Sequence, residues 1–424
     1  MSKTRLAQAV ALATLGASLT LPSLAHAEFI KDSKASLELR NFYFNRDLRH
    51  TSATEQSKRE EWAQGFIFKA ESGFTEGTVG FGLDAYAGLG LKLDSSDERA
   101  GTNLLPNAFK NEGPDEYSEA TATFKAKASK TVLKVGGLMP KLPSVSANDA
   151  RLLPQNFLGG HLNSQEIAGL TFDAGQLKEL NQRDSTDFQD LSVNALGGIR
   201  NFKFKGKGNQ GDDFNFAGLS YKWQDNLTTS YHYGELEELY KQHIFNVVHV
   251  LPIADQQSFK TDLRYARTTD DGRSSNIDNK YFGAMFTYAL SGHSVALGYQ
   301  KMSGDTGYAY LNGTDPFLVN YVQIGDFASK DEISWQARYD LNFASIGIPG
   351  LTFMTRYISG DNIDRGAALS EGKEWERDMD IGYVVQEGAL KNLGVKWRNS
   401  TMRSDALGEL DENRLIVSYS IPLL

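Results

Sequence analysis

Cysteine is absent from all 424 residues, so neither disulfide bonds nor thiolate chemistry contributes to this protein. The chain also lacks the H-E-x-x-H, G-x-S-x-G and Walker sequences that mark common hydrolases and nucleotide-binding enzymes. Its seven histidines are scattered without the spacing of a metal site. We therefore predict a protein that is not an enzyme and that holds no metal and no cofactor.

Long apolar runs are missing beyond the N-terminus, since no later stretch reaches the roughly 18 apolar residues of a membrane-spanning helix. The N-terminus itself carries Lys3 and Arg5, then an apolar segment, and then the small-residue cleavage pattern Ala25-His26-Ala27. We predict that residues 1–27 are a signal peptide that is removed on export. Residues 28–424 show no break in composition and are predicted to form a single domain.

Positive charge is also in deficit, because the formal net charge is −9. A nucleic-acid partner needs a positive footprint, so this class of partner is excluded. What the chain has instead is 40 glycines and 11% aromatic residues. This composition is typical of many short strands with tight connections and aromatic belts.

Alternation at period two is the most informative pattern in the sequence. In residues 79–87 the odd positions are apolar, while the even positions are glycine, aspartate and tyrosine. Residues 120–129 and 332–340 alternate in the same way. A membrane barrel produces this pattern because alternate residues face lipid and lumen. The spacing leaves room for roughly 16 to 18 strands, and we predict an all-β, transmembrane antiparallel barrel of 18 strands in the bacterial outer membrane, in contact with its lipid.

Two connections, residues 139–165 and 302–330, are too long and too apolar to be simple turns. Exposing that much aromatic and aliphatic surface to water forfeits about 25 cal/mol per Å². We therefore predict that both loops fold into the lumen and form its constriction. The alternative is that they pack over the extracellular mouth.

Cationic residues collect on the lumen-facing parity of the predicted strands. In a narrow channel of low dielectric constant, a row of such groups attracts carboxylates, which predicts a pore for small anionic solutes. The alternative is that these cations pair with acidic neighbours and only stiffen the wall. The acidic candidates are Glu38, Asp84, Asp262, Glu332, Asp340, Asp378 and Asp380. The predicted basic ladder is Arg40, Lys125, Arg264, Arg338, Arg356, Lys396, Arg398 and Arg414.

Several longer strings in the sequence are distinctive: Asn148-Asp149-Ala150-Arg151-Leu152-Leu153-Pro154-Gln155, Ser303-Gly304-Asp305-Thr306-Gly307, Tyr310-Leu311-Asn312-Gly313-Thr314-Asp315-Pro316 and Leu393-Gly394-Val395-Lys396-Trp397-Arg398-Asn399. With them, essentially the whole mature chain resembles the OprD family of substrate-specific outer-membrane porins. The resemblance implies an 18-stranded monomeric barrel whose third and seventh loops fold into the pore, although weak association of barrels stays open.

The same resemblance implies which residues form the narrowest part of the channel, the eyelet. Arg151 corresponds to the eyelet arginine of the family, while Tyr310 and Asp315 fall in the loop-seven string that lies opposite the ladder. Ser146 and Asp149 are further eyelet candidates.

The branch of the family that this sequence most resembles takes aromatic or cyclic carboxylates such as benzoate and vanillate. We therefore expect passive, substrate-selective diffusion of small carboxylates. Three alternatives stay open: a channel for basic amino acids and small peptides, a less selective general porin, and a plugged barrel whose loops bind partners.

Overall fold

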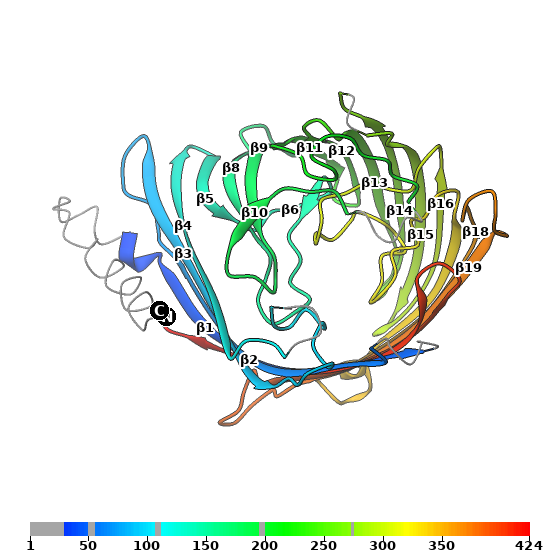
Figure 1. Ribbon diagram of the computed structural model, residues 1–424. Helices are drawn as coiled ribbons and strands as arrows, with labels where there is room; N and C mark the ends of the chain where they lie inside the picture. The colour runs from blue at the N-terminus through cyan, green and yellow to red at the C-terminus, as the bar shows by residue number, and fades with distance from the viewer. Residues whose placement is uncertain (1–28, 50–55, 107–111, 195–199, 273–274) are drawn as a thin grey trace.

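The computed structural model describes residues 29–49, 56–106, 112–194, 200–272 and 275–424 (Figure 1). The predicted signal peptide, residues 1–27, lies outside the described residues. The described chain forms a closed antiparallel barrel of 18 long strands, as the sequence predicts. The barrel closes because β1 (Lys34–Arg49) pairs with β2 (Lys58–Glu71) on one side and with β21 (Gly408–Pro422) on the other.

The remaining strands each pair with their neighbours in chain order. The strands of the barrel between β2 and β21 are β3 (Gly80–Asp94), β4 (Glu116–Ala128), β5 (Thr131–Leu138), β8 (Asn156–Ser164), β9 (Leu170–Asn181), β11 (Phe214–Gln224), β12 (Leu227–Leu236), β13 (Tyr240–Ala254), β14 (Gln257–Asp270), β15 (Asp278–Leu290), β16 (His293–Ser303), β17 (Ile333–Asn342), β18 (Leu351–Ile363), β19 (Gly372–Val384) and β20 (Gly394–Ser404). The connections also contain β6 (Lys141–Leu142), β7 (Val145–Ser146), β10 (Phe188–Asp190) and the 3₁₀ helix η3 (Phe343–Ile346).

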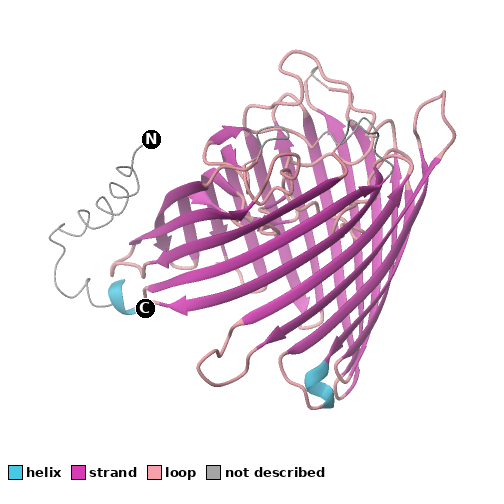
Figure 2. Cartoon of the chain, turned by 60° about the horizontal axis from the view of Figure 1, so that its bottom comes forward, coloured by secondary structure: helices cyan, strands magenta, loops and turns pink. Residues whose placement is uncertain are grey.

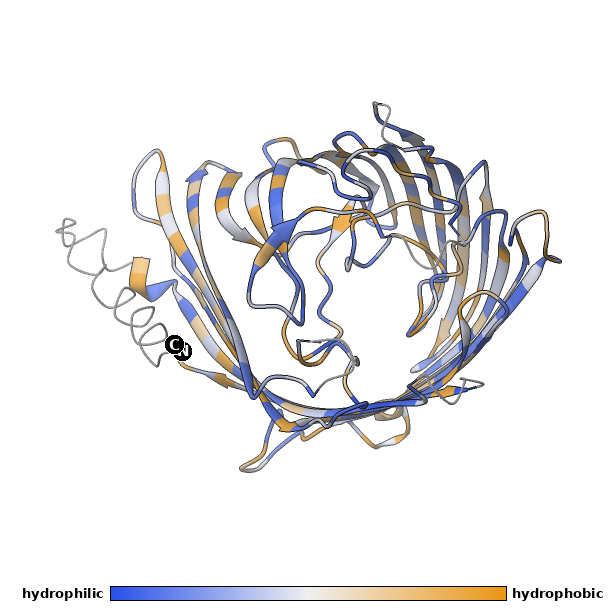
Figure 3. Cartoon of the chain, viewed as in Figure 1, coloured by the Kyte–Doolittle hydropathy of each residue, from blue (hydrophilic) through white to orange (hydrophobic). Residues whose placement is uncertain are grey.

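The predicted alternation is present along the strands. On β3, Phe81 and Leu83 are about half exposed on the outer surface, at 46% and 54%, whereas Asp84 and Tyr86 point inward. In lipid an outward apolar side chain is favourable and an outward charge is not, so this parity is the one the bilayer selects. Figure 3 shows the resulting alternation of hydrophilic and hydrophobic residues along the strands.

The strands run between a rim of short turns and a rim of long loops (Figure 2). In outer-membrane barrels the short turns are periplasmic and the long loops extracellular, which orients the chain. The long loops that matter below are loop 2 (residues 95–115), loop 3 (139–155), loop 4 (182–213) and loop 7 (304–332). Among the described residues, no helix is long and apolar enough to cross a membrane.

The C-terminal boundary predicted for the first long loop, residues 139–165, is wrong. Loop 3 stops at Gln155 rather than at residue 165, because Asn156–Ser164 form β8. Paired glycines explain the error: Gly136 of β5 faces Gly159 of β8, and a Cβ at either would lie 2.2 Å from a backbone oxygen of a neighbouring strand. Glycine is therefore required here by close strand packing, although its sequence signal is that of a loop.

Loops 3 and 7 fold into the lumen, as predicted, and they meet there (Figure 1). The backbone N–H of Asp315 in loop 7 donates to the carbonyl of Ser146 in loop 3, with 2.9 Å between N and O. Loop 3 also buries Leu152 and Leu153 in one apolar cluster with residues of loop 2, while loop 7 forms a β-bridge to loop 4. The lumen is therefore narrowed by apolar contacts between loops, which keep their hydrophobic surface away from water.

Candidate functional site

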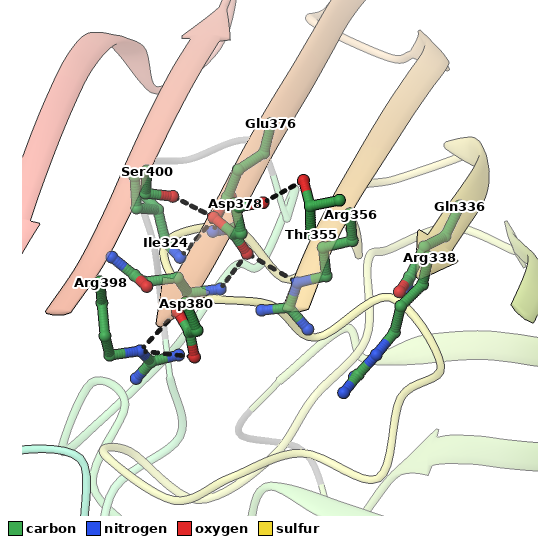
Figure 4. Close-up of polar contacts among 12 residues, drawn as sticks. Ile324, Gln336, Arg338, Thr355, Arg356, Glu376, Asp378, Asp380, Arg398 and Ser400 are labelled. Atoms are coloured by element: carbon green, nitrogen blue, oxygen red, sulfur yellow. Dashed lines mark hydrogen bonds and ion pairs between the residues drawn. The ribbon is translucent and has the colours of Figure 1, made fainter. Parts of the chain in front are cut away.

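A set of cationic side chains follows the inner wall from β17 to β1. Arg338 of β17 is the register partner of Arg356 on β18, and Arg398 of β20 is that of Arg414 on β21. Figure 4 shows Arg338, Arg356 and Arg398 projecting from β17, β18 and β20 toward the same side of the sheet. We call this set the cationic wall; its members are Arg40, Arg338, Arg356, Lys396, Arg398 and Arg414.

Each member of the cationic wall has a carboxylate partner, so the ion pairs considered as an alternative are present. Asp380 is the informative case, because Arg398 Nε and Lys396 Nζ both lie 3.1 Å from its carboxylate. One carboxylate thus serves two cations, and one positive charge is left over. The other pairs are Arg338 with Asp340 (2.7 Å), Arg356 with Asp378 (2.7 Å), Arg40 with Glu38 (2.9 Å) and Arg414 with Glu412 (2.5 Å).

Arg40 connects the wall to loop 3. Its Nη1 donates to Asp149 Oδ1 at 2.7 Å and to the carbonyl oxygen of Arg151 at 2.8 Å. Hydrogen bonds from a guanidinium group to a carboxylate are among the stronger ones in proteins. Strand β1 therefore fixes the position of the loop segment that carries Asp149 and Arg151.

A cavity of about 250 Å³ lies between this loop segment and the cationic wall. It brings together Arg40, Asp149 and Arg151 with Lys396 and Arg398, whose side chains come from β1, loop 3 and β20. The Lys396 side chain is the most open of these, with 48% of its surface exposed. We call this space the eyelet cavity; it is also lined by Glu38, Phe42, Ala150, Ile416 and Ser418.

The side chain of Arg151 is held by backbone oxygens rather than by a carboxylate. Its Nε donates to the carbonyl of Thr102 at 3.0 Å, and its guanidinium lies 5.1 Å from the centre of the Phe44 ring. Burial lowers the pKa of Arg151, and so do the guanidinium groups of Arg414 and Arg183. An anion that reached this point would relieve that repulsion.

Asp315 and Ser146 join the two loops. Besides the backbone bond between them, the Asp315 carboxylate accepts hydrogen bonds from Asn148 Nδ2 and from the Tyr321 hydroxyl, the latter at 3.0 Å. Burial raises the pKa of Asp315, while hydrogen bonding and the charges of Lys141 and Arg183 act in the opposite direction. Both residues hold the constriction together, and neither lines the eyelet cavity.

Tyr310 lies deeper than its predicted role in the eyelet suggests. Its hydroxyl donates to Asp326 at 2.8 Å and accepts from Asn194, and only 7% of the residue is exposed. The neighbouring Arg200 pairs with the same aspartate. Tyr310 therefore fastens loop 7 to loop 4 from the inside.

Two predicted ladder residues lie apart from the cationic wall. Lys125, close to the periplasmic end of β4, pairs with Asp84 at 2.5 Å and donates to the Ser72 carbonyl. Arg264 of β14 pairs with Asp262 at 2.9 Å, and its guanidinium stacks 4.1 Å from the ring centre of Phe317 in loop 7. Both point into the barrel, but from parts of the wall that do not reach the eyelet cavity.

The sequence prediction missed Arg46 and Arg183. Arg46 shares the buried Glu412 carboxylate with Arg414, so two cations again meet one acid. Its parity in β1 is that of Arg40, which is the signal that identifies it. Arg183 donates to Asn148 Oδ1 at 2.8 Å from loop 4, where no periodicity marks it.

Within the described ranges, no three His, Cys, Asp or Glu side chains are grouped so that they could hold a metal ion. The arrangement offers instead several guanidinium and ammonium groups around the eyelet cavity. Groups of this kind can donate charge-assisted hydrogen bonds to an anionic acceptor.

Comparison with known proteins gives a consistent result. The family described as "outer membrane porin, OprD family" matches residues 27–423. The porin-like protein GalP of Pseudomonas putida is 39% identical over 416 residues, covering 97% of each chain. The crystal structure of Pseudomonas aeruginosa OpdQ has 62% sequence identity and a TM-score of 0.86, covering 94% of this chain and all of that one. A BenF-like porin from Pseudomonas fluorescens has 41% identity and a TM-score of 0.87, covering 93% of this chain and all of that one.

Proposed function

Because this chain belongs to the OprD family of outer-membrane porins, we propose that its channel passes small carboxylates, of the aromatic or cyclic kind exemplified by benzoate and vanillate. The relatives are porins, which are channels and not enzymes, and they place the protein in the bacterial outer membrane. The proposal concerns what passes through the channel. It rests on the eyelet cavity, where Arg40, Arg151, Lys396 and Arg398 converge.

The charge at the eyelet cavity favours an anion. Lys396 and Arg398 share the single carboxylate of Asp380, so a passing carboxylate supplies the second acceptor that this pair lacks. A guanidinium fork binds a carboxylate through two parallel hydrogen bonds, which favours carboxylate over a spherical anion of the same charge.

Movement along the wall follows from the geometry of the barrel. Strands tilt by roughly 35 to 45° from the barrel axis, so register partners such as Arg338 and Arg356 stand at different heights in the membrane. A carboxylate released by one cation therefore meets the next at another depth. Each contact competes with a wall carboxylate, which keeps every site weak enough for conduction.

Two apolar side chains support the preference for a ring. Phe42 and Ile416 line the eyelet cavity next to the cations, and they offer a dry face to the body of an aromatic or cyclic acid. One relative is itself titled a BenF-like porin. A carboxylate with an apolar body thus fits both the cations and the apolar side chains that line the cavity.

A second candidate is a channel for basic amino acids, favoured by the acidic Glu38 of β1 and Asp149 of loop 3, which both line the same cavity. In this case the ammonium group of the solute would replace Arg40 as the partner of Asp149, whose side chain is 40% exposed. A wide general porin is disfavoured, because loops 3 and 7 meet through Ser146 and Asp315.

Uptake into liposomes that contain the purified protein distinguishes these candidates. We expect benzoate and vanillate to enter faster than arginine, and Arg398→Gln to slow benzoate entry about tenfold by removing one charge-assisted hydrogen-bonding group. Lys391→Gln is the matched control, since it removes one positive charge from an exposed turn after β19. Faster entry of arginine, or equal loss in the two variants, would contradict the proposal.

A further inference from the structure

A belt of aromatic side chains surrounds part of the outer surface below the extracellular loops. The register makes Phe245 of β13 the partner of Tyr265 on β14, and Tyr265 the partner of Phe282 on β15. The ring centres of Phe245 and Tyr265 lie 6.4 Å apart, as do those of Phe282 and Tyr299 on β16. Aromatic rings of this kind mark the boundary between hydrocarbon and headgroups.

Three cationic residues on the same outward face lie two residues closer to the extracellular loops than the aromatic belt. Arg267, Lys280 and Lys301 each follow or precede a belt residue by two positions in β14, β15 and β16, so they share its outward face. Arg267 is the register partner of Lys280, and Lys301 is the partner of Phe282. We call Arg267, Lys280 and Lys301 the outer basic rim; it lies at the depth of the outer-leaflet headgroups.

The rim carries more positive than negative charge. Arg267 donates to Asp278 at 2.8 Å, but Lys280 and Lys301 are exposed, and no carboxylate of the described residues lies within ion-pair distance of them. The nearby acids Asp331 and Asp364 share the single cation Lys330, so one negative charge is left over beside the rim and reduces its positive excess.

The opposite side of the barrel has a different rim. On β1, β2, β20 and β21 the outward cations at the same level are matched by acids. Asp411 lies 2.7 Å from Arg49 and 2.9 Å from Arg403, and Lys58 pairs with Glu60. Unmatched positive charge is therefore present on the face formed by β14 to β16, and again on β19, where the exposed Lys373 and Arg377 make no ion pair with a described carboxylate.

A hollow adjoins the rim at Lys301. It measures about 390 Å³ and is lined by Lys301 of β16 and by Arg365 and Leu369 of the loop after β18. Three carboxylates also line it, those of Asp331, Asp364 and Glu371. Carboxylates therefore outnumber cations in the hollow, which bounds the positively charged rim on the side of β18.

We propose that the outer basic rim binds the phosphate groups of lipopolysaccharide, the glycolipid of the outer leaflet, in one orientation on the face of β14 to β16. Lys280 and Lys301 contact the phosphates of its diglucosamine headgroup, and the aromatic belt packs against its acyl chains. The site lies outside the channel and is independent of what the channel conducts.

Binding is measured by native mass spectrometry of the full-length mature protein in detergent, titrated with lipid A that carries both phosphates. A lysine near an anionic lipid surface contributes about 1 kcal/mol, which corresponds to roughly fivefold in affinity, so Lys280→Gln with Lys301→Gln weakens binding on the order of 25-fold. Both residues face outward and make no ion pair, so the double variant keeps the fold. The control is Lys130→Gln with Lys391→Gln, which removes two exposed charges from periplasmic turns.

Lipid A without phosphates, phosphatidylglycerol and inorganic phosphate are the competing ligands. The proposal expects lipid A with both phosphates to bind at least tenfold more tightly than each of them, since only that lipid offers phosphates and acyl chains at the required spacing. It is overturned if the dephosphorylated lipid binds equally well, if inorganic phosphate displaces the lipid, or if the control variant loses as much affinity as the rim variant.

Discussion

Asp315 of loop 7 and Ser146 of loop 3 are joined by a hydrogen bond of 2.9 Å between two backbone groups in the lumen, although the two residues are 169 positions apart in the sequence (315 − 146). The contact fixes the width of the passage, because each loop is anchored at its other end to the wall. The first predictions follow from this relationship.

Replacing Asp315 with alanine loosens the constriction. The variant removes the acceptor of Asn148 and Tyr321, which costs about 1.5 to 3 kcal/mol for each hydrogen bond to a charged group. We expect a higher and noisier single-channel current in planar bilayers. Thr186→Ala, in an exposed part of loop 4, is the control and leaves the current unchanged.

The same carboxylate makes loop docking depend on pH. Burial raises the pKa of Asp315 in the docked loop above the ordinary value of about 3.9. Its contribution to docking is therefore fully present below the ordinary pKa and is lost as the pH rises through the raised pKa. Gating events should become rarer as the pH falls from 7 to 4. Asp315→Asn should abolish this dependence; an unchanged dependence in that variant would assign it to another group.

Arg151→Ala should reduce benzoate uptake about tenfold, since the variant deletes a cation from the eyelet cavity. Arg151→Lys should rescue only weakly, because one ammonium group does not reproduce the fork that reaches the Thr102 and Ala150 carbonyls. Heat-modified mobility on gels reports whether the barrel itself is intact. Full uptake by Arg151→Ala would remove Arg151 from the eyelet.

Asp380→Asn should increase selectivity for anions. The change releases Lys396 and Arg398 from their shared carboxylate, so the local charge rises by one unit. The shift appears as a change in reversal potential under a salt gradient. Asp361→Asn, an exposed position near the extracellular end of β18, loses the same charge away from the lumen and should leave the reversal potential unchanged.

The lipid-facing surface predicts an effect on stability. Leu297 of β16 is 60% exposed on the outer face, so Leu297→Arg should lower the free energy of unfolding in lipid vesicles by about 2 to 4 kcal/mol. Ala296→Ser, the adjacent residue that points into the lumen, should change it by less than about 1 kcal/mol. Urea titration followed by tryptophan fluorescence measures both.

The barrel architecture was predictable because the alternation of apolar and polar residues can be recognised within each strand on its own. Phe81 and Leu83 report the lipid face from their own positions, without any knowledge of their neighbours. The start of β8 was not predictable in the same way. Gly159 has the signal of a loop residue, and only its closeness to backbone on the next strand makes it a strand residue.

The residue types of the site and the face they occupy were predictable from the sequence. Their pairing and their burial were less predictable. Parity places Arg356 and Asp378 in the lumen, but their pairing depends on the register between β18 and β19, which the sequence does not encode locally. Tyr310 illustrates the same limit. Its resemblance to a loop-seven residue of the family indicates the loop, whereas its burial against Asp326 follows from how loop 7 packs on loop 4.

The pairing of β1 with β21 also constrains how the molecule is made. These two strands are the most distant in sequence, and their register runs from Ser36 opposite Pro422 to Arg49 opposite Glu409. Until β21 has been delivered, β1 has an unsatisfied edge of backbone N–H and C=O groups, which invites pairing with another chain. Contacts this far apart in sequence form late and slowly. A barrel that lacks its last strand is therefore prone to pair with another chain during assembly. The edge of β1 must stay shielded until β21 pairs with it.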